Sequence, residues 1–466
     1  MTGVAIVGGG YSGAAAAVQL SRARGLSLAI DIVEPRAELG RGLAYSTPDP
    51  DHRLNGPLDN HLVDPSVPDE ILRWCAERAI FERDPDVRGS NGALYLRRGD
   101  FGAHVRDVVR ATPSISHHRV SATGLRRSAT GFEVLAGAVR IAADFVIVAT
   151  GTGTSSFPGA FSALESHPGL IADPFDRARL LGIGSGARVF LVGAGLTALD
   201  VVSTLLRAGH RGRITAFSRR GVRPRPPRDR LPEGSTSGLM DRIDGPMPAY
   251  IGQVLERGGI VDLSRALRRK IEEARKSGES WQPVFDELRN SVWRFWPQLP
   301  IDEKRRFLRH LRTWYDAHRF RTPPQNAAMA AEAERAGMLV YPTGRIRSVR
   351  EVGERIAVSW VDRAGATVEE RFDVVVNCAG LDASCGATSN PFLTDLLAQG
   401  LARIDPTGFG FEVDAQCRPI GRDGAPTPGL RIVGPPSAGS LGDPLGVPFI
   451  APQIRRMIPG ILAELR

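Results

Sequence analysis

The sequence predicts an α/β fold that contains two parallel-sheet units of one kind, with a helical segment inserted in the second. Three observations support this prediction. The stretches MTGVAIVGGGYSG (1–13) and FLVGAGLTALDVV (190–202) each have the pattern of a buried strand, a glycine turn and the start of a helix. Between residues 228 and 324 this pattern gives way to helical spacing with several tryptophans. The 466 residues are also too many for one ordinary hydrophobic core.

Composition narrows the class of protein. No apolar run reaches the roughly 18 residues of a membrane-spanning helix, so we expect no membrane span. The N-terminus enters a strand at once, so we expect no secretory signal and a cytoplasmic location. Cys75, Cys378, Cys385 and Cys417 lack metal-ligand spacing, so we predict no metal site.

The net charge of +9 raises the question of a nucleic-acid partner. Only Lys270, Lys276 and Lys304 are lysines among the 60 basic residues, and the arginines are scattered along the chain. This distribution is typical of a GC-rich coding sequence rather than of a binding surface. We therefore predict no nucleic-acid partner, and the chain gives no indication of its oligomeric state.

The first glycine turn has the spacing G-x-G-x-x-G. It follows the short apolar run Val4–Val7 and consists of Gly8, Gly10 and Gly13. In dinucleotide-binding folds these three glycines serve a tight turn, a close approach of backbone to pyrophosphate, and close packing of helix on strand. The helix predicted at Ala14–Leu20 would then point its free amide groups at the phosphates.

A second strand, Leu28–Val33, ends in Glu34, which lies 21 residues after Gly13. An acidic residue at that place hydrogen-bonds a ribose hydroxyl in Rossmann-like domains. Strand, turn, helix and acid together predict a dinucleotide site with a free ribose. The alternative is a purely structural turn in an α/β domain without a ligand.

The second glycine turn differs from the first in its acidic position. Strand Ala187–Val192 leads into Gly193, Gly195 and Ala198, an accepted variant of the same spacing. The next strand, Arg213–Phe217, ends in Ser218-Arg219-Arg220 rather than in a carboxylate. Guanidinium groups bind a 2′-phosphate that a carboxylate would repel, so NADPH is expected in preference to NADH. The alternative for the two arginines is a solvated basic turn.

Two dinucleotide sites suit a resident FAD and a visiting NADPH that passes hydride to the flavin. Strands Phe145–Val148 and Asp373–Val376 are predicted to close the two nucleotide domains, the first ending in Ala149-Thr150-Gly151. We therefore predict two Rossmann-like dinucleotide-binding domains, for FAD and NADPH, with an inserted helical subdomain. The predicted ranges are 1–170 and 381–466 for the FAD-binding domain, 180–380 for the NAD(P)H-binding domain, and 228–324 for the insertion.

The insertion contains an apolar helical face. Phe307, Leu308, Leu311, Trp314, Tyr315 and His318 recur at helical spacing. We interpret this face as core, and His318 as a satisfied core histidine rather than a base. Two basic clusters flank the insertion, and their arginines Arg223, Arg225, Arg319 and Arg321 are candidate contacts for an anionic substrate or for NADPH phosphates. The alternative is a solvated linker.

Several segments resemble one bacterial family of FAD/NAD(P)-binding flavoproteins. The segments are LGRGLAYST (39–47), HRLNGPLDN (52–60), LYLRRGDFGAHV (94–105), FSRRGVRPRPP (217–227), RRFLRHLRTWYDAHRFRTPP (305–324), VVNCAGLD (375–382) and the glycine-rich tract 434–457. This family includes a flavin-dependent urate hydroxylase and aspartate N-monooxygenases that form nitrosuccinate. The chain departs from the family at Asn55-Gly56-Pro57-Leu58, where N-V-P-A is expected, so the lining of the flavin pocket differs there.

The resemblance implies further cofactor contacts. Arg41 and Gly42 would lie near the FAD phosphates, and Arg97, Arg98 and Phe101 beside or over the flavin. Asp443 would bond the ribitol, with a plain turn as the alternative, and the helix that begins near Val447 would present amides to the flavin. The predicted FAD contacts are Gly8, Gly10, Ser12, Gly13, Glu34, Arg41, Gly42, Asn55, Arg97, Thr150, Gly151, Asp443, Phe449 and Ile450. The predicted NADPH contacts are Gly193, Gly195, Leu196, Thr197, Ser218, Arg219 and Arg220.

The resemblance also implies an activity, that of an NAD(P)H-driven monooxygenase in which reduced flavin and oxygen form a C4a-hydroperoxide. The sequence offers no catalytic triad or paired carboxylates, which suits a cofactor that carries the reactive oxygen. Urate, oxidised to 5-hydroxyisourate, is the first expected substrate, and an aspartate-like amino acid is the alternative. A flavin reductase or diaphorase and a non-enzymatic FAD-bound redox scaffold remain further alternatives.

Overall fold

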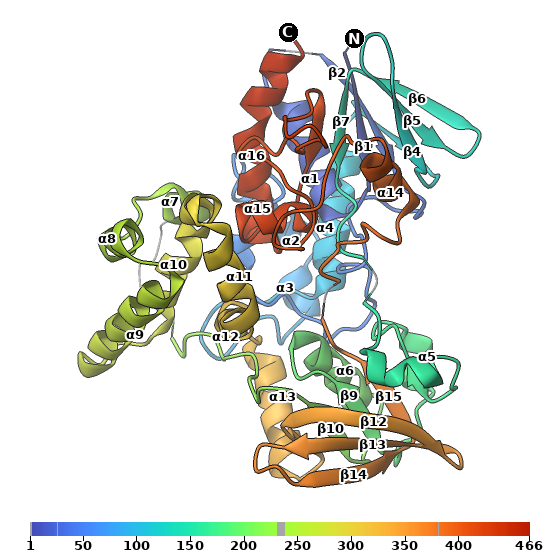
Figure 1. The fold of residues 1–466 in the computed structure, drawn as a ribbon, viewed down its shortest axis with the longest axis vertical. Helices are drawn as coiled ribbons and strands as arrows, with labels where there is room; N and C mark the ends of the chain where they lie inside the picture. Colours follow the sequence, from blue (N-terminus) through green and yellow to red (C-terminus); the bar gives the residue numbers. More distant parts are fainter. Residues whose placement is uncertain (1, 26, 154, 231–237, 381) are drawn as a thin grey trace.

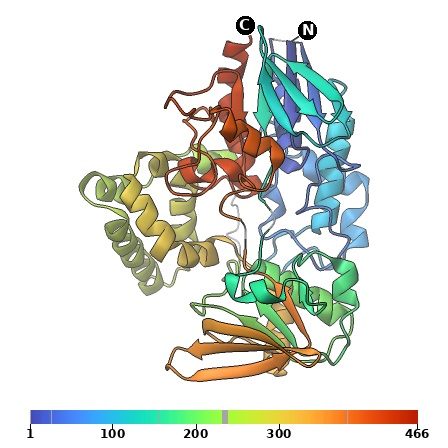
Figure 2. The same ribbon diagram turned by 45° about the vertical axis from the view of Figure 1, so that its right-hand side comes forward.

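The computed structural model describes residues 2–25, 27–153, 155–230, 238–380 and 382–466 (Figure 1). Three parts are visible: a first domain that contains both chain termini, a second domain at the opposite end, and a helical subdomain beside them (Figures 1 and 2). Parts of the ranges predicted from the sequence, residues 1, 26, 154, 231–237 and 381, lie outside the described residues.

The first domain is built on a five-stranded parallel sheet of order β16-β7-β1-β2-β3. Its strands are β1 (Thr2–Val7), β2 (Leu28–Val33), β3 (Ile115–His118), β7 (Phe145–Val148) and β16 (Leu430–Ile432). Strand β1 is buried on both faces: Val4 and Ile6 belong to one core cluster, Ala5 and Val7 to another. This double burial explains why its sequence is a continuous apolar run.

Different elements cover the two faces of the first sheet. Helices α1 (Tyr11–Arg22), α4 (Arg98–Arg110) and α16 (Val447–Glu464) pack on one face. The antiparallel strands β4 (Gly124–Arg127), β5 (Phe132–Ala136) and β6 (Val139–Ala143), with α14 (Pro391–Ala398), cover the other. The shorter elements of this domain are α2 (Glu70–Glu77), α3 (Ile80–Arg83), α15 (Ala438–Leu441) and the 3₁₀ turns Leu58–Asn60 and Pro435–Ser437.

The second domain repeats this plan. Its parallel sheet has the order β11-β10-β9-β15-β8. The strands are β8 (Leu170–Ile171), β9 (Val189–Val192), β10 (Ile214–Phe217), β11 (Leu339–Val340) and β15 (Val374–Asn377). Helices α5 (Arg177–Leu181), α6 (Leu196–Arg207) and α13 (Pro324–Arg335) contribute to the core on one face, and β12 (Gly344–Val352), β13 (Arg355–Asp362) and β14 (Thr367–Phe372) to that on the other. The predicted fold class is thereby confirmed.

The boundary between the two domains differs from the predicted one. Strand β8 pairs with β15, so Leu170 already belongs to the second sheet. Phe161, in the 3₁₀ segment Gly159–Leu164, is fully buried in the core between that sheet and β12–β14. The chain therefore leaves the first domain well before residue 170. A two-residue edge strand carries no periodic pattern by which the sequence could have marked this change.

The helical subdomain comprises α7 (Leu239–Asp244), α8 (Ala249–Arg257), α9 (Ile260–Lys276), α10 (Gln282–Phe295), the 3₁₀ turn Trp296–Gln298, α11 (Ile301–His310) and α12 (Arg312–Arg319). The predicted single apolar face is interrupted at Leu311, which separates α11 from α12. Trp314 is consequently 44% exposed, which corrects its assignment to the core. His318 stacks on Phe285, and its Nδ1 lies 2.7 Å from the Trp314 carbonyl oxygen, as a structural histidine would. None of the described helices is long and apolar enough to cross a membrane.

Candidate functional site

The first glycine turn has a different spatial requirement at each glycine. A Cβ on Gly8, whose φ is +103°, would lie 2.5 Å from the Ala149 carbonyl oxygen. A Cβ on Gly13 would lie 1.9 Å from the Gly8 carbonyl oxygen, because helix α1 packs directly on the turn. Gly10 is different: its Cβ would meet only the Gly42 Cα, at 3.5 Å. Gly10 therefore leaves open space at the N-terminus of α1, as a pyrophosphate site requires.

Glu34 lies beside this turn. It is 4% exposed, and its carboxylate accepts hydrogen bonds from the backbone amides of Gly9, at 2.9 Å, and Arg36, at 3.0 Å. Thr150, after the neighbouring strand β7, has a buried Oγ1 with no partner among the described residues. No atom would lie within 4 Å of a Cβ on Gly151. An acid, an uncommitted hydroxyl and open backbone thus surround the end of β1, and these residues fit the ribose and phosphates of a dinucleotide.

The second glycine turn repeats this geometry. A Cβ on Gly193, whose φ is +134°, would lie 2.1 Å from the Cys378 carbonyl oxygen, the counterpart of the Gly8–Ala149 contact. A Cβ on Gly195 would have no atom within 4 Å. Leu196 and Thr197 follow as the first residues of α6. The amides at the start of α6 are therefore open in the same way as those of α1.

The structure separates the roles of the two arginines after β10. Arg219 is exposed and has no partner in the part of the chain that the structure describes. Arg220 instead donates to the carbonyl oxygens of Arg309, at 2.8 Å, and His310, at 2.9 Å, at the C-terminus of α11. The Ser218 hydroxyl accepts a hydrogen bond from the Gly221 amide at 3.1 Å. The prediction of a 2′-phosphate contact therefore stays with Arg219, because the guanidinium of Arg220 has a structural role.

Replacing Arg219 by alanine should raise KM for NADPH by roughly tenfold to a hundredfold, since a charge-assisted hydrogen bond contributes about 1.5–3 kcal/mol. KM for NADH should change little, because NADH has no 2′-phosphate. Steady-state oxidation of both coenzymes measures this difference, and Arg220→Ala is the matched control that should leave the NADPH/NADH preference unchanged. An equal response of both coenzymes to Arg219→Ala would show that this guanidinium does not contact the phosphate.

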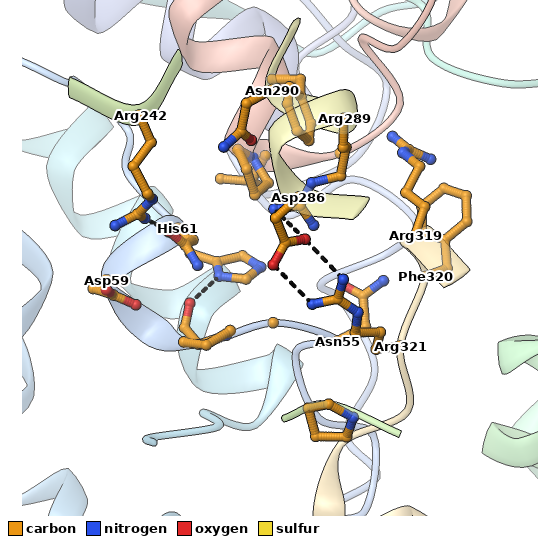
Figure 3. Close-up of a pocket in the computed structure, with 18 of the residues that line it drawn as sticks. Asn55, Asp59, His61, Arg242, Asp286, Arg289, Asn290, Arg319, Phe320 and Arg321 are labelled. Carbon is orange, nitrogen blue, oxygen red and sulfur yellow. Dashed lines mark hydrogen bonds and ion pairs between the residues drawn. The ribbon is translucent and has the colours of Figure 1, made fainter. Parts of the chain in front are cut away.

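A cavity of about 740 Å³ lies between the first domain and the helical subdomain (Figure 3). Its wall contains six arginines and three carboxylates, so the charge of the wall favours an anionic ligand. These residues are Arg98, Arg228, Arg242, Arg289, Arg319, Arg321, Asp59, Asp286 and Glu287.

The first domain supplies one wall of the cavity. Asn55, His61, Val447 and Phe449 line it, and the N-terminus of α16 opens onto it. His61 is buried, and desolvation lowers its pKa to about 4, so the ring is neutral near pH 7. Its Nδ1 lies 2.9 Å from the Pro57 carbonyl oxygen, which places the proton on Nδ1 and leaves Nε2 as an acceptor.

The helical subdomain supplies the opposite wall. Arg321 forms a bidentate pair with Asp286, with distances of 2.8 and 3.1 Å (Figure 3). Arg289 lies 3.6 Å from the same carboxylate, and its guanidinium lies 5.3 Å from the centre of the Phe449 ring. Arg242 donates to the side-chain oxygen of Asn60, a contact that joins α7 to the first domain.

Asp443 and Arg319 form a buried ion pair beside this wall, with side chains 4% and 3% exposed. The Tyr315 hydroxyl also donates to Asp443, at 3.0 Å. Desolvation raises the pKa of Asp443 to about 6 in spite of the Arg319 charge. Asp443 therefore binds the helical subdomain to the first domain. The sequence predicted a ribitol contact, or alternatively a plain turn, and neither prediction included this ion pair with Arg319.

The structure brings only some of the predicted residues together. Arg319 and Arg321 line the cavity, whereas Arg223 and Arg225 are exposed outside it. Arg223 pairs with Glu334, at 2.9 Å, and lies over the ring of Tyr341, so it belongs to the second domain's surface.

Four residues predicted to contact FAD are engaged within the protein instead. Arg97 lies 3.1 Å from Asp84, and Arg41 donates to Glu38 at 2.9 Å. Phe101 is fully buried in the core beside α1, where no cofactor can reach it. Neighbouring Arg98 lines the cavity but is engaged by Asp200.

Sequence reasoning missed the cavity face of α10. Gln282, Asp286, Arg289 and Asn290 line the cavity and recur at intervals of four, three and one residues. The other face of the helix, with Phe285, Leu288, Val292 and Phe295, is buried and apolar. This polar face was the available signal, but an ordinary solvent-exposed helix face has the same pattern.

Two nucleotide turns with open helix N-termini, on two α/β domains beside a helical subdomain, define the fold of the two-dinucleotide flavoproteins. Residues 5–153 match the model of an FAD-NAD(P)-binding family, which supports this assignment for the first domain. No curated protein sequence matches the chain.

Solved structures extend the likeness over the whole chain. The L-lysine 6-monooxygenase of Pseudomonas syringae has a TM-score of 0.65 at 15% identity, covering 100% of both chains. The ornithine N-hydroxylase of Kutzneria sp. 744 has a TM-score of 0.63 at 14% identity, covering 99% of both. The cadaverine monooxygenase of Erwinia amylovora has a TM-score of 0.61 at 11% identity, covering 99% of this chain and 94% of the other. At such identities these likenesses establish the shared fold.

Proposed function

We propose that this protein is an FAD-dependent, NADPH-driven monooxygenase that hydroxylates a nitrogen atom of a small anionic amino acid. The observation that carries the proposal is the arginine-rich cavity, which adjoins the N-terminus of α16 in a chain with two nucleotide turns. When bound, the reduced flavin supplies the electrons that activate molecular oxygen.

The residues present fit FAD in the first domain. Gly10 and Gly42 leave room for the pyrophosphate at the N-terminus of α1, and Glu34 is placed for the ribose. The N-terminus of α16 opens onto the cavity at Val447, and the positive end of the helix dipole is suited to a ring that becomes negatively charged on reduction. The Pro448 nitrogen carries no hydrogen and the Phe449 and Ile450 amides donate to the Gly446 carbonyl oxygen, so the free amide of this first turn is that of Val447. Gly195 and Arg219 would hold NADPH in the second domain.

The choice of a nitrogen atom rests on the structural neighbours, whose names describe hydroxylation or oxygenation of ornithine, lysine and cadaverine. The choice of an anion rests on this chain's own cavity, with three more arginines than carboxylates in its wall. A cationic diamine would be repelled by such a wall, whereas an acidic amino acid would be attracted. The substrate class proposed here therefore differs in charge from cadaverine.

Urate also satisfies the charge of the cavity, since it is an anion at neutral pH. The neighbours' names favour amine nitrogen over the purine ring, so we propose an amino-acid substrate, the alternative in the sequence analysis, in place of urate. A reductase and an FAD-bound scaffold remain distinguishable outcomes of the same experiment.

The test is oxygen uptake and NADPH oxidation by the FAD-loaded protein with L-aspartate, L-glutamate, L-ornithine, cadaverine and urate. We expect L-aspartate or L-glutamate to stimulate both rates and to yield an N-oxygenated product. Stimulation by urate alone would establish that the substrate is urate rather than an amino acid. Rapid NADPH oxidation that no substrate stimulates would indicate a reductase, and absence of flavin reduction would indicate a scaffold.

A further inference from the structure

One wall of the cavity contains buried polar atoms without partners. Gln282 Oε1, Arg289 Nε and Asn290 Oδ1 on α10, and Nε and Nη1 of Arg319, make no hydrogen bond among the described residues. Buried polar groups in folded proteins normally have partners, because an unsatisfied one loses its hydration without compensation. The concentration of such atoms on one wall indicates that a ligand satisfies them.

The charges on this wall are also incomplete. Arg321 and Arg289 both face Asp286, so two guanidinium groups share one carboxylate. Glu287 is exposed. Partial desolvation raises the pKa of its carboxyl, and the charge that opposes this rise is that of Lys270 on α9. Arg319 is neutralised by Asp443. Among Arg289, Arg319 and Arg321, one positive charge therefore remains uncompensated, and it resides on Arg289.

Arg289 is held in place without using its hydrogen-bonding capacity. The ring of Phe449 lies beneath its guanidinium, and Asp286, at 3.6 Å, is too far for a hydrogen bond. No hydrogen bond of Arg289 is found among the described residues, although its side chain is 20% exposed and lines the cavity. A fixed guanidinium with free donors is suited to bidentate binding of a carboxylate.

We propose that the polar face of α10 is the substrate-recognition element, in which Arg289 binds a carboxylate and Asn290 accepts an N–H group of the same molecule. This assignment rests on the proposed function, since it places that reaction's substrate against α10. It requires a ligand that combines a carboxylate with an N–H donor. Asp286 acts as a positioning residue, because it holds Arg289 and Arg321 without contacting the ligand.

The test is calorimetric binding of L-aspartate and succinate to the FAD-loaded protein, without NADPH. Succinate retains both carboxylates of L-aspartate but lacks its nitrogen. Arg289→Gln should weaken binding of both molecules by roughly tenfold to a hundredfold, the loss expected for a charge-assisted hydrogen bond. Asn290→Leu should weaken L-aspartate by about tenfold and leave succinate unchanged. Arg269→Gln, on the exposed surface of α9, is the matched control and should change neither affinity.

The outcomes separate this assignment from the proposed function. Unchanged affinities in Arg289→Gln, or a loss of succinate binding in Asn290→Leu, would overturn the assignment to α10 even if turnover continues. Binding that follows the expected pattern without any NADPH-dependent product would overturn the proposed function and leave the assignment intact. If the unmodified protein binds neither molecule, the assignment is wrong. Circular dichroism of each variant excludes loss of fold as the cause.

Discussion

Replacing Gly10 by alanine is expected to give a folded protein that no longer retains FAD. The added Cβ would meet only the Gly42 Cα, at 3.5 Å, which is ordinary van der Waals contact, so the chain itself accommodates it. The methyl group would occupy the space through which the pyrophosphate approaches the amides of α1. Loss of one charge-assisted hydrogen bond raises the FAD dissociation constant by roughly tenfold to a hundredfold. Flavin absorbance of the purified protein and FAD titration measure this loss.

Two other glycines serve as controls for this result. Gly195→Ala makes the same change in the second domain, so FAD should be retained while KM for NADPH rises. Gly13→Ala should disturb the fold itself, because its Cβ would lie 1.9 Å from the Gly8 carbonyl oxygen. The melting temperatures must be compared in the FAD-free proteins, since bound FAD stabilises the native state. Full retention of FAD by Gly10→Ala would contradict the placement of the pyrophosphate.

The parallel sheets were predictable because their strands are buried on both faces. The apolar run of β7 ends at Val148, as the sequence predicts, since burial on both faces leaves no polar position inside it. Strand β2 ends at Val33, also as predicted, although it contains one charged residue, Asp31, which pairs with His118 on β3. The two glycine turns were predictable for a similar reason. Steric demands at Gly8 and Gly13 act between residues close in the chain or on adjacent strands.

The arginines were less predictable, because their partners are distant in sequence. Arg220 was expected to bind a phosphate, yet its guanidinium bonds carbonyl groups 89 and 90 residues away. The choice between Arg223 and Arg321 as cavity residues depends in the same way on how the helical subdomain docks. Local sequence records that a guanidinium is present, whereas the docking of separate elements decides what it binds.

The cavity wall on α10 shows the same limit from the opposite direction. Gln282 and Asn290 are polar residues on a helix, and such residues normally face solvent. Both are buried, at 6% and 8% exposure, because α10 lies between the subdomain core and the first domain. Their unpartnered atoms become informative only once this burial is known.

The contact between the two nucleotide domains gives the second large expected effect. Arg98, the first residue of α4, forms a bidentate pair with Asp200 on α6, at 2.6 and 3.1 Å. The side chains are 14% and 8% exposed, and Arg98 also donates to the Arg53 carbonyl oxygen. His52 Nε2 lies 3.2 Å from the Asp200 carbonyl oxygen, so the ion pair is part of a larger polar interface. The relative orientation of the domains, on which the proposed hydride transfer would depend, is therefore fixed at α6.

Asp200→Ala should destabilise the protein by about 3–5 kcal/mol, the usual effect of leaving one member of a buried ion pair without its partner. Urea denaturation measures the loss, and stopped-flow reduction of bound FAD by NADPH should be slowed in the same variant.

Arg110→Ala is the matched control on α4, because Arg110 is 64% exposed and lies 3.5 Å from Glu38. Such a surface pair contributes less than about 1 kcal/mol. The double variant Arg98→Leu/Asp200→Leu should be more stable than Asp200→Ala, since it leaves no buried charge. If Asp200→Ala and Arg110→Ala are equally stable, the Arg98–Asp200 pair does not hold the two domains together.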